Sequence, residues 1–163
     1  MPAGSSLREV TGHWWIDPKI LPSISVAPTV RVVLSAQAKE FSEAWLESEF
    51  IVTPQSDRMG LRLEGPALVR KSGVELLSSA VTPGTVQVPP DGQPIVLMAD
   101  AQTIGGYPQL AQVIGVDLPL LAQLRPGDRV RFRVVKIGEA QEQWLARERA
   151  LAMLREGLAQ KIR

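Results

Sequence analysis

The chain has 163 residues, of which 45% are hydrophobic and 21% are charged, and its formal net charge is +1. This length suits one domain with its own core, and so small a net charge gives no electrostatic reason to expect a nucleic acid or an anionic membrane as partner. The sequence contains no cysteine, which excludes disulfides, zinc–thiolate sites, iron–sulfur clusters and cysteine nucleophiles. It also lacks a signal-peptide pattern and a membrane-length apolar run, so we expect a cytoplasmic protein.

The first segment, residues 1–28, is rich in proline, glycine and serine and predicts an extended N-terminal arm. It contains the only histidine of the chain, His13, followed by Trp14 and Trp15. A histidine that binds a metal or acts as a general base usually has further ligands or an orienting partner. Because no such residue accompanies His13, we expect it and the two tryptophans to serve packing and predict no metal site.

Residues 29–137 alternate between short β-rich segments and turn residues, which is typical of a small β-barrel. An amphipathic helix is predicted over Phe41–Phe50, and a brief helix capped by Asp117 is predicted over Leu118–Leu124. Strands are expected at Val30–Leu34, Ile51–Thr53, Leu61–Leu63, Thr85–Val88, Ile95–Ala99, Leu110–Val116 and Arg129–Ile137.

The last segment, residues 138–163, predicts a C-terminal amphipathic helix that packs on the barrel or against another subunit. One apolar stripe is formed by Trp144, Leu151, Leu154, Leu158 and Ile162. The predicted fold is therefore mainly β, a barrel with peripheral helices and this C-terminal helix.

Charge is distributed unevenly along the chain. Residues 125–163 carry ten Lys or Arg against five Asp or Glu, whereas residues 1–124 carry eight against twelve. A solvated basic face on the last strand and helix accounts for this difference. Docking of that face to an acidic partner is the alternative.

Residues 81–114 are dense in glycine and proline, which fix the shape of the backbone and so indicate loops that position polar groups. Gln87, Gln93 and Gln102 each lie at or beside a predicted strand end, with Thr103 and Tyr107 close by. A glutamine amide donates and accepts at once and therefore matches another amide edge. We expect these residues to bind an amide-like ligand; the alternative is that they are isolated polar residues of strands.

Two further features of the sequence concern ligand binding. The chain has neither G-x-x-x-x-G-K-[ST] nor G-x-G-x-x-G, so a phosphate site would be unconventional or supplied by another chain. A charged turn contains Asp57 and Arg58, with Arg62 and Glu64 beyond it. Arg58 could clamp a carboxylate or phosphate, or an internal Asp–Arg ion pair could fix the turn.

Three blocks, residues 56–66, 75–100 and 102–114, resemble the family of the carboxyltransferase-like subunit of 5-oxoprolinase, also called allophanate hydrolase subunit 2. The resemblance runs from about residue 30 to about residue 135. It implies a cyclophilin-like β-barrel that works in a complex with a homologous, kinase-inhibitor-like subunit and a third subunit. It further implies ATP-dependent opening of the lactam 5-oxoproline, with ATP handled by the assembled complex.

The family pattern is only partly present. Its members are typically about twice this length, and their N-terminal half, with a T-V-Q-D-x-G-R-like stretch, has no counterpart here. The chain thus resembles the C-terminal half, and we expect it to be inactive alone. Family members also often carry Lys or Arg where this chain has Gln109.

The resemblance and the residues together lead to one set of expected site residues. Catalytic residues stay unassigned. The expected substrate-binding residues are Arg58, Gln87, Gln93, Gln102, Thr103 and Tyr107, and the expected loop-shaping residues are Gly60, Gly65, Pro89, Gly105, Gly106 and Pro108. The alternatives are a non-catalytic regulator that binds a kinase-inhibitor-like subunit, and carboxyl transfer from biotin to urea or an amide.

Overall fold

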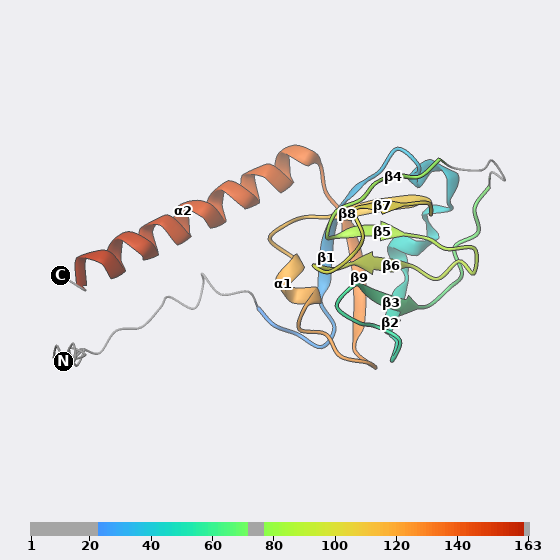
Figure 1. Cartoon of the computed structure of the whole chain (residues 1–163), viewed down its shortest axis with the longest axis horizontal. Helices are drawn as coiled ribbons and strands as arrows, with labels where there is room; N and C mark the ends of the chain where they lie inside the picture. The colour runs from blue at the N-terminus through green and yellow to red at the C-terminus, as the bar shows by residue number, and fades with distance from the viewer. Residues whose placement is uncertain (1–22, 72–76, 162–163) are drawn as a thin grey trace, which may run out of the picture.

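The structure, a computed structural model, describes residues 23–71 and 77–161 (Figure 1). His13, Trp14 and Trp15, with most of the predicted arm, lie outside the described residues. No helix of the described ranges is both long enough and apolar enough to cross a membrane.

Seven strands form a closed barrel, as predicted. Neighbouring strands run antiparallel except where β9 closes the barrel parallel to β1. Around the barrel the order is β1 (Thr29–Leu34), β8 (Gln109–Val113), β5 (Thr85–Gln87), β6 (Ile95–Leu97), β3 (Gly60–Glu64), β2 (Glu49–Val52) and β9 (Arg129–Val134).

Alternating side chains fill the barrel. On β9, Val130 and Phe132 are buried while the three arginines that alternate with them are exposed, because successive side chains of a strand point to opposite faces. The Phe132 ring packs edge-on against Trp45, with ring centres 5.7 Å apart, and lies 5.8 Å from the Phe50 ring. The three rings belong to the same buried core cluster.

The predicted helix over Phe41–Phe50 is too long. Two short 3₁₀ helices occupy this region, η2 (Ala38–Glu40) and η3 (Glu43–Glu47), with Trp45 buried in η3. The last three residues of the predicted span do not continue the helix, because Phe50 lies in β2 and pairs with Val130 of β9. Strand pairing and core packing thus override the local helical pattern.

Asp117 precedes the short helix α1 (Leu118–Leu121), but its side chain does not cap it, contrary to the prediction. Its carboxylate is 2% exposed and accepts hydrogen bonds from the Arg31 backbone N–H at 2.7 Å, Nε at 2.9 Å and Nη2 at 2.5 Å. These bonds raise the pKa of the Arg31 guanidinium, against the opposing effect of burial. Asp117 therefore anchors α1 to β1.

Two strands that the sequence did not predict, β4 (Ser79–Ala80) and β7 (Ile104–Gly105), form a separate two-stranded sheet. Each has two residues, too few for an alternating pattern to show. The sheet nevertheless positions the glycine-rich segment that follows β7.

The C-terminal helix, α2, spans Ile137–Lys161. It leaves the end of β9 and projects away from the barrel (Figure 1). Its contact with the barrel is at its root, where the Trp144 ring lies over Gly115.

Candidate functional site

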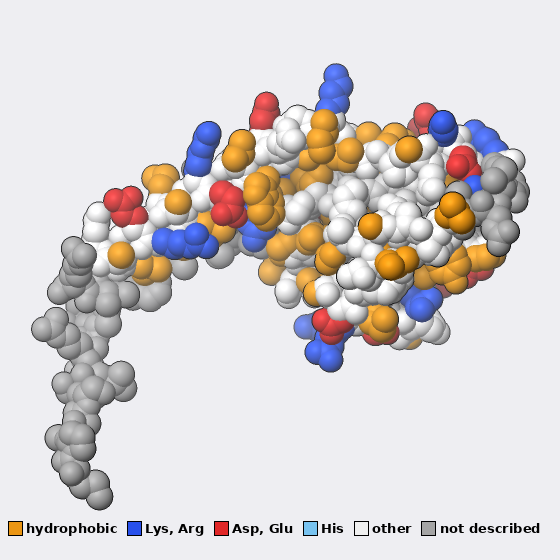
Figure 2. Space-filling model, turned by 45° about the horizontal axis from the view of Figure 1, so that its top comes forward, with side chains coloured by type: hydrophobic (Ala, Val, Ile, Leu, Met, Phe, Trp, Pro, Cys, Tyr) orange, Lys and Arg blue, Asp and Glu red, His pale blue; other side chains and the backbone are white. Residues whose placement is uncertain are grey.

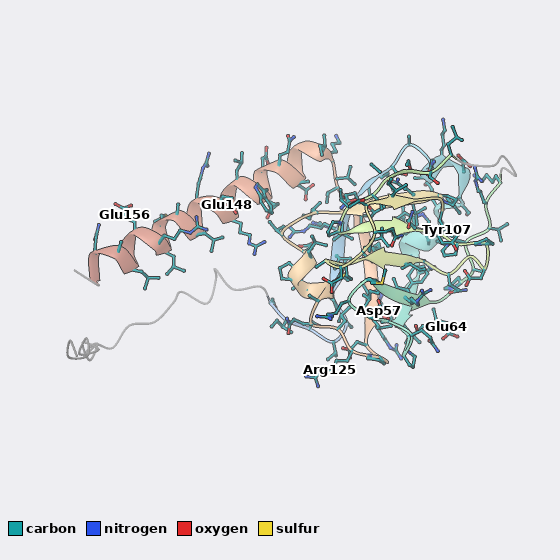
Figure 3. The ribbon with its side chains drawn as sticks, in the orientation of Figure 1. Asp57, Glu64, Tyr107, Arg125, Glu148 and Glu156 are labelled. Carbon is teal, nitrogen blue, oxygen red and sulfur yellow. The ribbon has the colours of Figure 1, made fainter. Side chains whose placement is uncertain are left out.

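Two cavities lie on either side of the turn at residues 89–92, and Asp91 lines both. The first, here the tyrosine cavity, measures about 670 Å³ and the second, the carboxylate cavity, about 640 Å³. In Figure 3 Tyr107 marks the first, and Asp57 and Glu64 the second, all on the barrel and away from the length of α2.

The wall between the two cavities is fixed by backbone hydrogen bonds. Gly92 adopts φ +76°, donates to the Pro89 carbonyl and accepts from the Leu68 N–H, both at 2.9 Å. A Cβ on Gly92 would lie 2.9 Å from the Leu68 backbone nitrogen, so a side chain there is excluded by both conformation and space. Asp91 accepts from the Gln93 N–H at 2.9 Å and closes the turn.

The Gln93 side chain forms two hydrogen bonds with the backbone of Gly65. Its Oε1 accepts from the Gly65 N–H at 2.9 Å, and its Nε2 donates to the Gly65 carbonyl at 3.2 Å. Gly65 is required because a Cβ would lie 2.5 Å from the Phe50 ring. Both polar atoms of the Gln93 amide thus bond to the Gly65 backbone, and its predicted role in binding a ligand stays a prediction.

Gln87 lies beneath the glycine-rich segment. It is 1% exposed, and its Nε2 donates to the Tyr107 carbonyl at 3.3 Å. Gly105 packs directly on this amide, at a distance where a Cβ would clash. Gln87 thus supports the loop that carries Tyr107, and no described cavity is lined by it.

The tyrosine cavity brings together several expected residues. Its lining includes the expected Pro89, Gly106, Tyr107 and Pro108, together with Phe41, Ala67, Leu68, Val69, Arg70, Val88, Pro90, Asp91 and Gly92. Most of this surface is apolar, and Tyr107 contributes a phenol that is accessible to solvent.

Arg70 is the cationic side chain in this lining, and sequence reasoning missed it. Its Nε lies 2.5 Å from Glu40 Oε2, and the Glu40 carbonyl accepts from the Lys71 N–H at 2.8 Å. The pair is thirty residues apart in sequence. No local pattern in the sequence identifies such a contact.

The carboxylate cavity has a lining that is about half polar and includes the expected Gln93. Asp57, Glu64 and Asp91 supply carboxylates, and Arg62 and Gln55 also line it. Asp57 already accepts from the N–H groups of Met59 and Gly60, at 2.8 and 3.0 Å. Within the described ranges, no three carboxylate or histidine side chains are grouped closely enough to hold a metal ion.

Arg58, Gln102 and Thr103 line neither of these two cavities. The Arg58 side chain is 92% exposed and its Nε lies 3.4 Å from Asp100, so the turn is fixed by Asp57 bonding to backbone and not by an Asp57–Arg58 pair. Gln102 and Thr103 are exposed. Their predicted role in binding stays a prediction.

The basic outer face of β9 is largely balanced by acidic neighbours. Arg129 and Arg131 both contact Glu49, at 2.7 and 2.9 Å, and Arg133 lies 3.4 Å from Glu139. These arginines remain about 60% exposed, so the pairs add little stability. Docking of this face to an acidic partner stays a prediction, with less unbalanced charge than the sequence indicates.

Comparison with known proteins bears out the resemblance in the sequence. The family described as carboxyltransferase domain, subdomain A and B, matches residues 1–134. The chain is 40% identical over 144 residues to a 5-oxoprolinase subunit of Haemophilus influenzae, covering 86% of this chain and 47% of that protein. It is 48% identical over 98 residues to the corresponding 5-oxoprolinase subunit of Escherichia coli, covering 60% and 32% respectively.

A solved structure, the urea carboxylase of Kluyveromyces lactis, shares the fold with a TM-score of 0.75 at 22% identity, over 82% of this chain and 13% of that chain. The chain spans about half the length, or less, of the curated relatives it matches. On the strength of the family match over most of its length, the chain belongs to the family of carboxyltransferase domains, subdomains A and B, with the two 5-oxoprolinase subunits as its relatives.

Proposed function

We propose that this chain is the substrate-binding barrel of a multi-subunit, ATP-dependent lactam hydrolase of the 5-oxoprolinase type. The observation that carries the proposal is the 48% identity over 98 residues to a subunit of 5-oxoprolinase. The proposed partners are a homologous, kinase-inhibitor-like subunit and a third subunit.

The tyrosine cavity suits a small lactam acid such as 5-oxoproline. Its apolar walls, including Phe41 and Leu68, match the methylene groups of a five-membered ring. Arg70 lies at the wall where a substrate carboxylate would be attracted, although Glu40 balances part of its charge. The Tyr107 hydroxyl can donate to or accept from the lactam amide.

The described lining of the tyrosine cavity contains no serine, lysine or histidine. It therefore offers groups that bind and orient a substrate, and no amine or imidazole to attack it. We infer that the reactive groups come from another subunit, consistent with a chain that is inactive alone.

The residues around the cavities do not fit ATP. The carboxylate cavity presents three carboxylates against one arginine, Arg62, a net negative charge that repels a triphosphate. The tyrosine cavity offers one paired arginine. The chain also lacks a phosphate-binding loop motif. We therefore assign ATP to the other subunits of the complex.

Gly106→Leu tests the cavity assignment directly. Gly106 is exposed, has no positive φ, and a Cβ there would meet its nearest atom, Ser78 Oγ, at an ordinary 3.7 Å. The variant therefore folds while its side chain fills part of the cavity. In the complex assembled with both partner subunits, we expect KM for 5-oxoproline to rise about tenfold or more, since a tenfold loss corresponds to about 1.4 kcal/mol of binding.

Gly138→Leu is the matched control, because Gly138 has nothing within 4 Å of its Cβ position and lies on α2. Glutamate formation from 5-oxoproline and ATP is measured for both variants. An unchanged KM in Gly106→Leu would refute the cavity assignment alone. A wild-type complex that binds its partners but opens no lactam would refute the proposed function.

A further inference from the structure

Three polar side chains are buried in the part of the chain that the structure describes, those of Thr85, Gln87 and Asp117. Asp117 anchors α1 to β1, and Thr85 bonds across β5 and β8. The Gln87 amide differs, because it bonds to the segment that carries Tyr107. Burying an amide is costly, and a methionine of similar volume would fill the same space without that cost. The amide at position 87 therefore indicates a role beyond packing.

The backbone on both sides of Tyr107 is held in place. Its own carbonyl accepts from Gln87 Nε2 at 3.3 Å, and the next carbonyl, that of Pro108, accepts from the Val88 N–H at 3.0 Å. Before Tyr107, Gly105 pairs within the β4–β7 sheet and packs on the Gln87 amide. Of these contacts, those made by Gln87 are the ones that come from a side chain. One buried amide thus fixes the Tyr107 carbonyl and supports the strand that leads to it.

The Tyr107 side chain, in contrast, is available to a ligand. It lines the tyrosine cavity and is 46% exposed. Among the described residues its hydroxyl has no hydrogen-bond partner. The phenol therefore combines a fixed backbone with an unpaired hydroxyl. This arrangement suits a binding residue, because a group that is held in place beforehand loses less conformational entropy when the ligand binds.

The surface around this loop carries little charge. Figure 2, which turns β4 and β7 toward the viewer, shows mostly apolar and uncharged side chains over that part of the barrel, with charged ones toward its margins. In the described lining of the tyrosine cavity, the charged residues are Asp91 and Arg70, and Arg70 is paired with Glu40. The Tyr107 hydroxyl is therefore the neutral polar side chain of this lining and suits a neutral amide. It bonds to an amide only within about 3 Å, so its position determines how well it binds.

We propose that Gln87 is a positioning residue for substrate binding, whose amide holds Tyr107 where the phenol bonds to the lactam amide. This inference rests on the proposed function, since it assumes that the tyrosine cavity binds a lactam acid. Gln87 lines neither cavity, so it acts through Tyr107 without touching the substrate. Loss of the Gln87 amide lowers the fraction of molecules in which the phenol is in place. The apparent affinity falls by that fraction, while the chemical step is unchanged.

A double-mutant cycle in the assembled complex tests this dependence. Gln87→Met keeps a similar volume without a hydrogen-bond donor, and Tyr107→Phe removes the hydroxyl alone. We expect each variant to raise KM for 5-oxoproline about fivefold with kcat unchanged, which is the range of one hydrogen bond. In the double variant, Gln87→Met is expected to add nothing to Tyr107→Phe, because the hydroxyl that it positions is already gone. A variant that merely unfolds in part would lower kcat and leave KM unchanged.

Tyr107 is the only tyrosine of the chain, so incorporation of 3-fluorotyrosine places a single fluorine in the cavity wall. In the full chain without partner subunits, we expect Gln87→Met to shift or broaden this fluorine resonance. Gly105→Ala, whose Cβ displaces the same amide, is a second variant with the same expected effect on the resonance and on KM. Gln112→Met is the matched control and is expected to change neither. Gln112 Nε2 also donates to a backbone carbonyl, that of Pro83 at 2.8 Å, but Gln112 lines the groove at the root of α2.

The outcomes separate this inference from the proposed function. An unchanged KM in Gln87→Met, or effects that simply add in the double variant, would overturn the positioning role. A fluorine resonance that neither Gln87→Met nor Gly105→Ala alters would overturn it as well. A wild-type complex that opens no lactam would refute the proposed function, and the fluorine resonance of the chain would then decide whether Gln87 holds Tyr107.

Discussion

The cavity end of the barrel and the projecting part of α2 differ in whether their polar side chains have partners within the chain. Around the cavities, Gln87 and Gln93 bond to backbone, and Gln109 also bonds within the chain, to Ala80 among others. Along α2, Glu148 and Arg155 have no ion-pair partner among the described residues. A cluster of polar residues in the sequence can therefore serve to hold the fold together. Charged side chains without an ion-pair partner occur instead on a helix that the sequence does not single out.

The largest expected contrast between the two regions is in packing. Phe50 is fully buried against Phe132, so Phe50→Ala is expected to lower the free energy of unfolding by about 3–5 kcal/mol. Leu154→Ala on α2 is expected to change it by less than about 0.5 kcal/mol, because no described element packs on that part of the helix. Urea denaturation measures both. A large loss in Leu154→Ala would mean that α2 packs within its own chain.

Charge gives the next contrast. Asp117→Asn leaves the Arg31 guanidinium without its carboxylate, and we expect a loss of about 3 kcal/mol because the pair is largely buried. Asp100→Asn removes a partner from exposed Arg58 and is expected to cost less than about 0.5 kcal/mol. Thermal unfolding compares the two. Equal effects would contradict the structural role assigned to Asp117.

Two adjacent glycines, Gly105 and Gly106, are expected to differ in how far an added Cβ lowers stability. Gly105→Ala forces a Cβ against the Gln87 amide, and we expect it to destabilise the barrel by about 1–3 kcal/mol. Gly106→Ala places its Cβ in ordinary van der Waals contact, 3.7 Å from Ser78 Oγ, and is expected to leave stability within about 0.5 kcal/mol of wild type. Chemical denaturation of both proteins provides the measurement, and a reversed order would refute the packing of Gly105 on Gln87.

The smallest expected effect on stability separates a glutamine that bonds to backbone, Gln93, from an exposed one, Gln102. Gln93→Leu leaves the Gly65 backbone groups without their partner and is expected to cost about 1 kcal/mol. Exposed Gln102→Leu is expected to leave stability unchanged. If Gln102→Leu instead raises KM for the lactam in the assembled complex, Gln102 binds substrate despite its position outside the described cavities.

Sequence patterns were sufficient to predict the barrel, and four of the expected residues, Pro89, Gly106, Tyr107 and Pro108, line the tyrosine cavity. The strand that became β9 and the loops that glycine and proline shape within residues 81–114 depend on neighbours in sequence, and both were predicted. The overlong helix over Phe41–Phe50 failed because Phe50 pairs across the barrel with Val130. The cap assigned to Asp117 failed because its partner, Arg31, lies eighty-six residues away.

The sequence by itself determined the family, the strand periodicity and the loops that glycine and proline shape, because these depend on short-range conformational preferences. Only the tertiary structure decided which polar groups were already engaged. It placed Gln87 and Gln93 on backbone amides, brought Arg70 to Glu40 in the cavity wall, and left the stripe of α2 outside the barrel. The physical reason is that the hydrogen-bond partner of a polar group often comes from a segment distant in sequence. Such segments become neighbours only when the barrel closes.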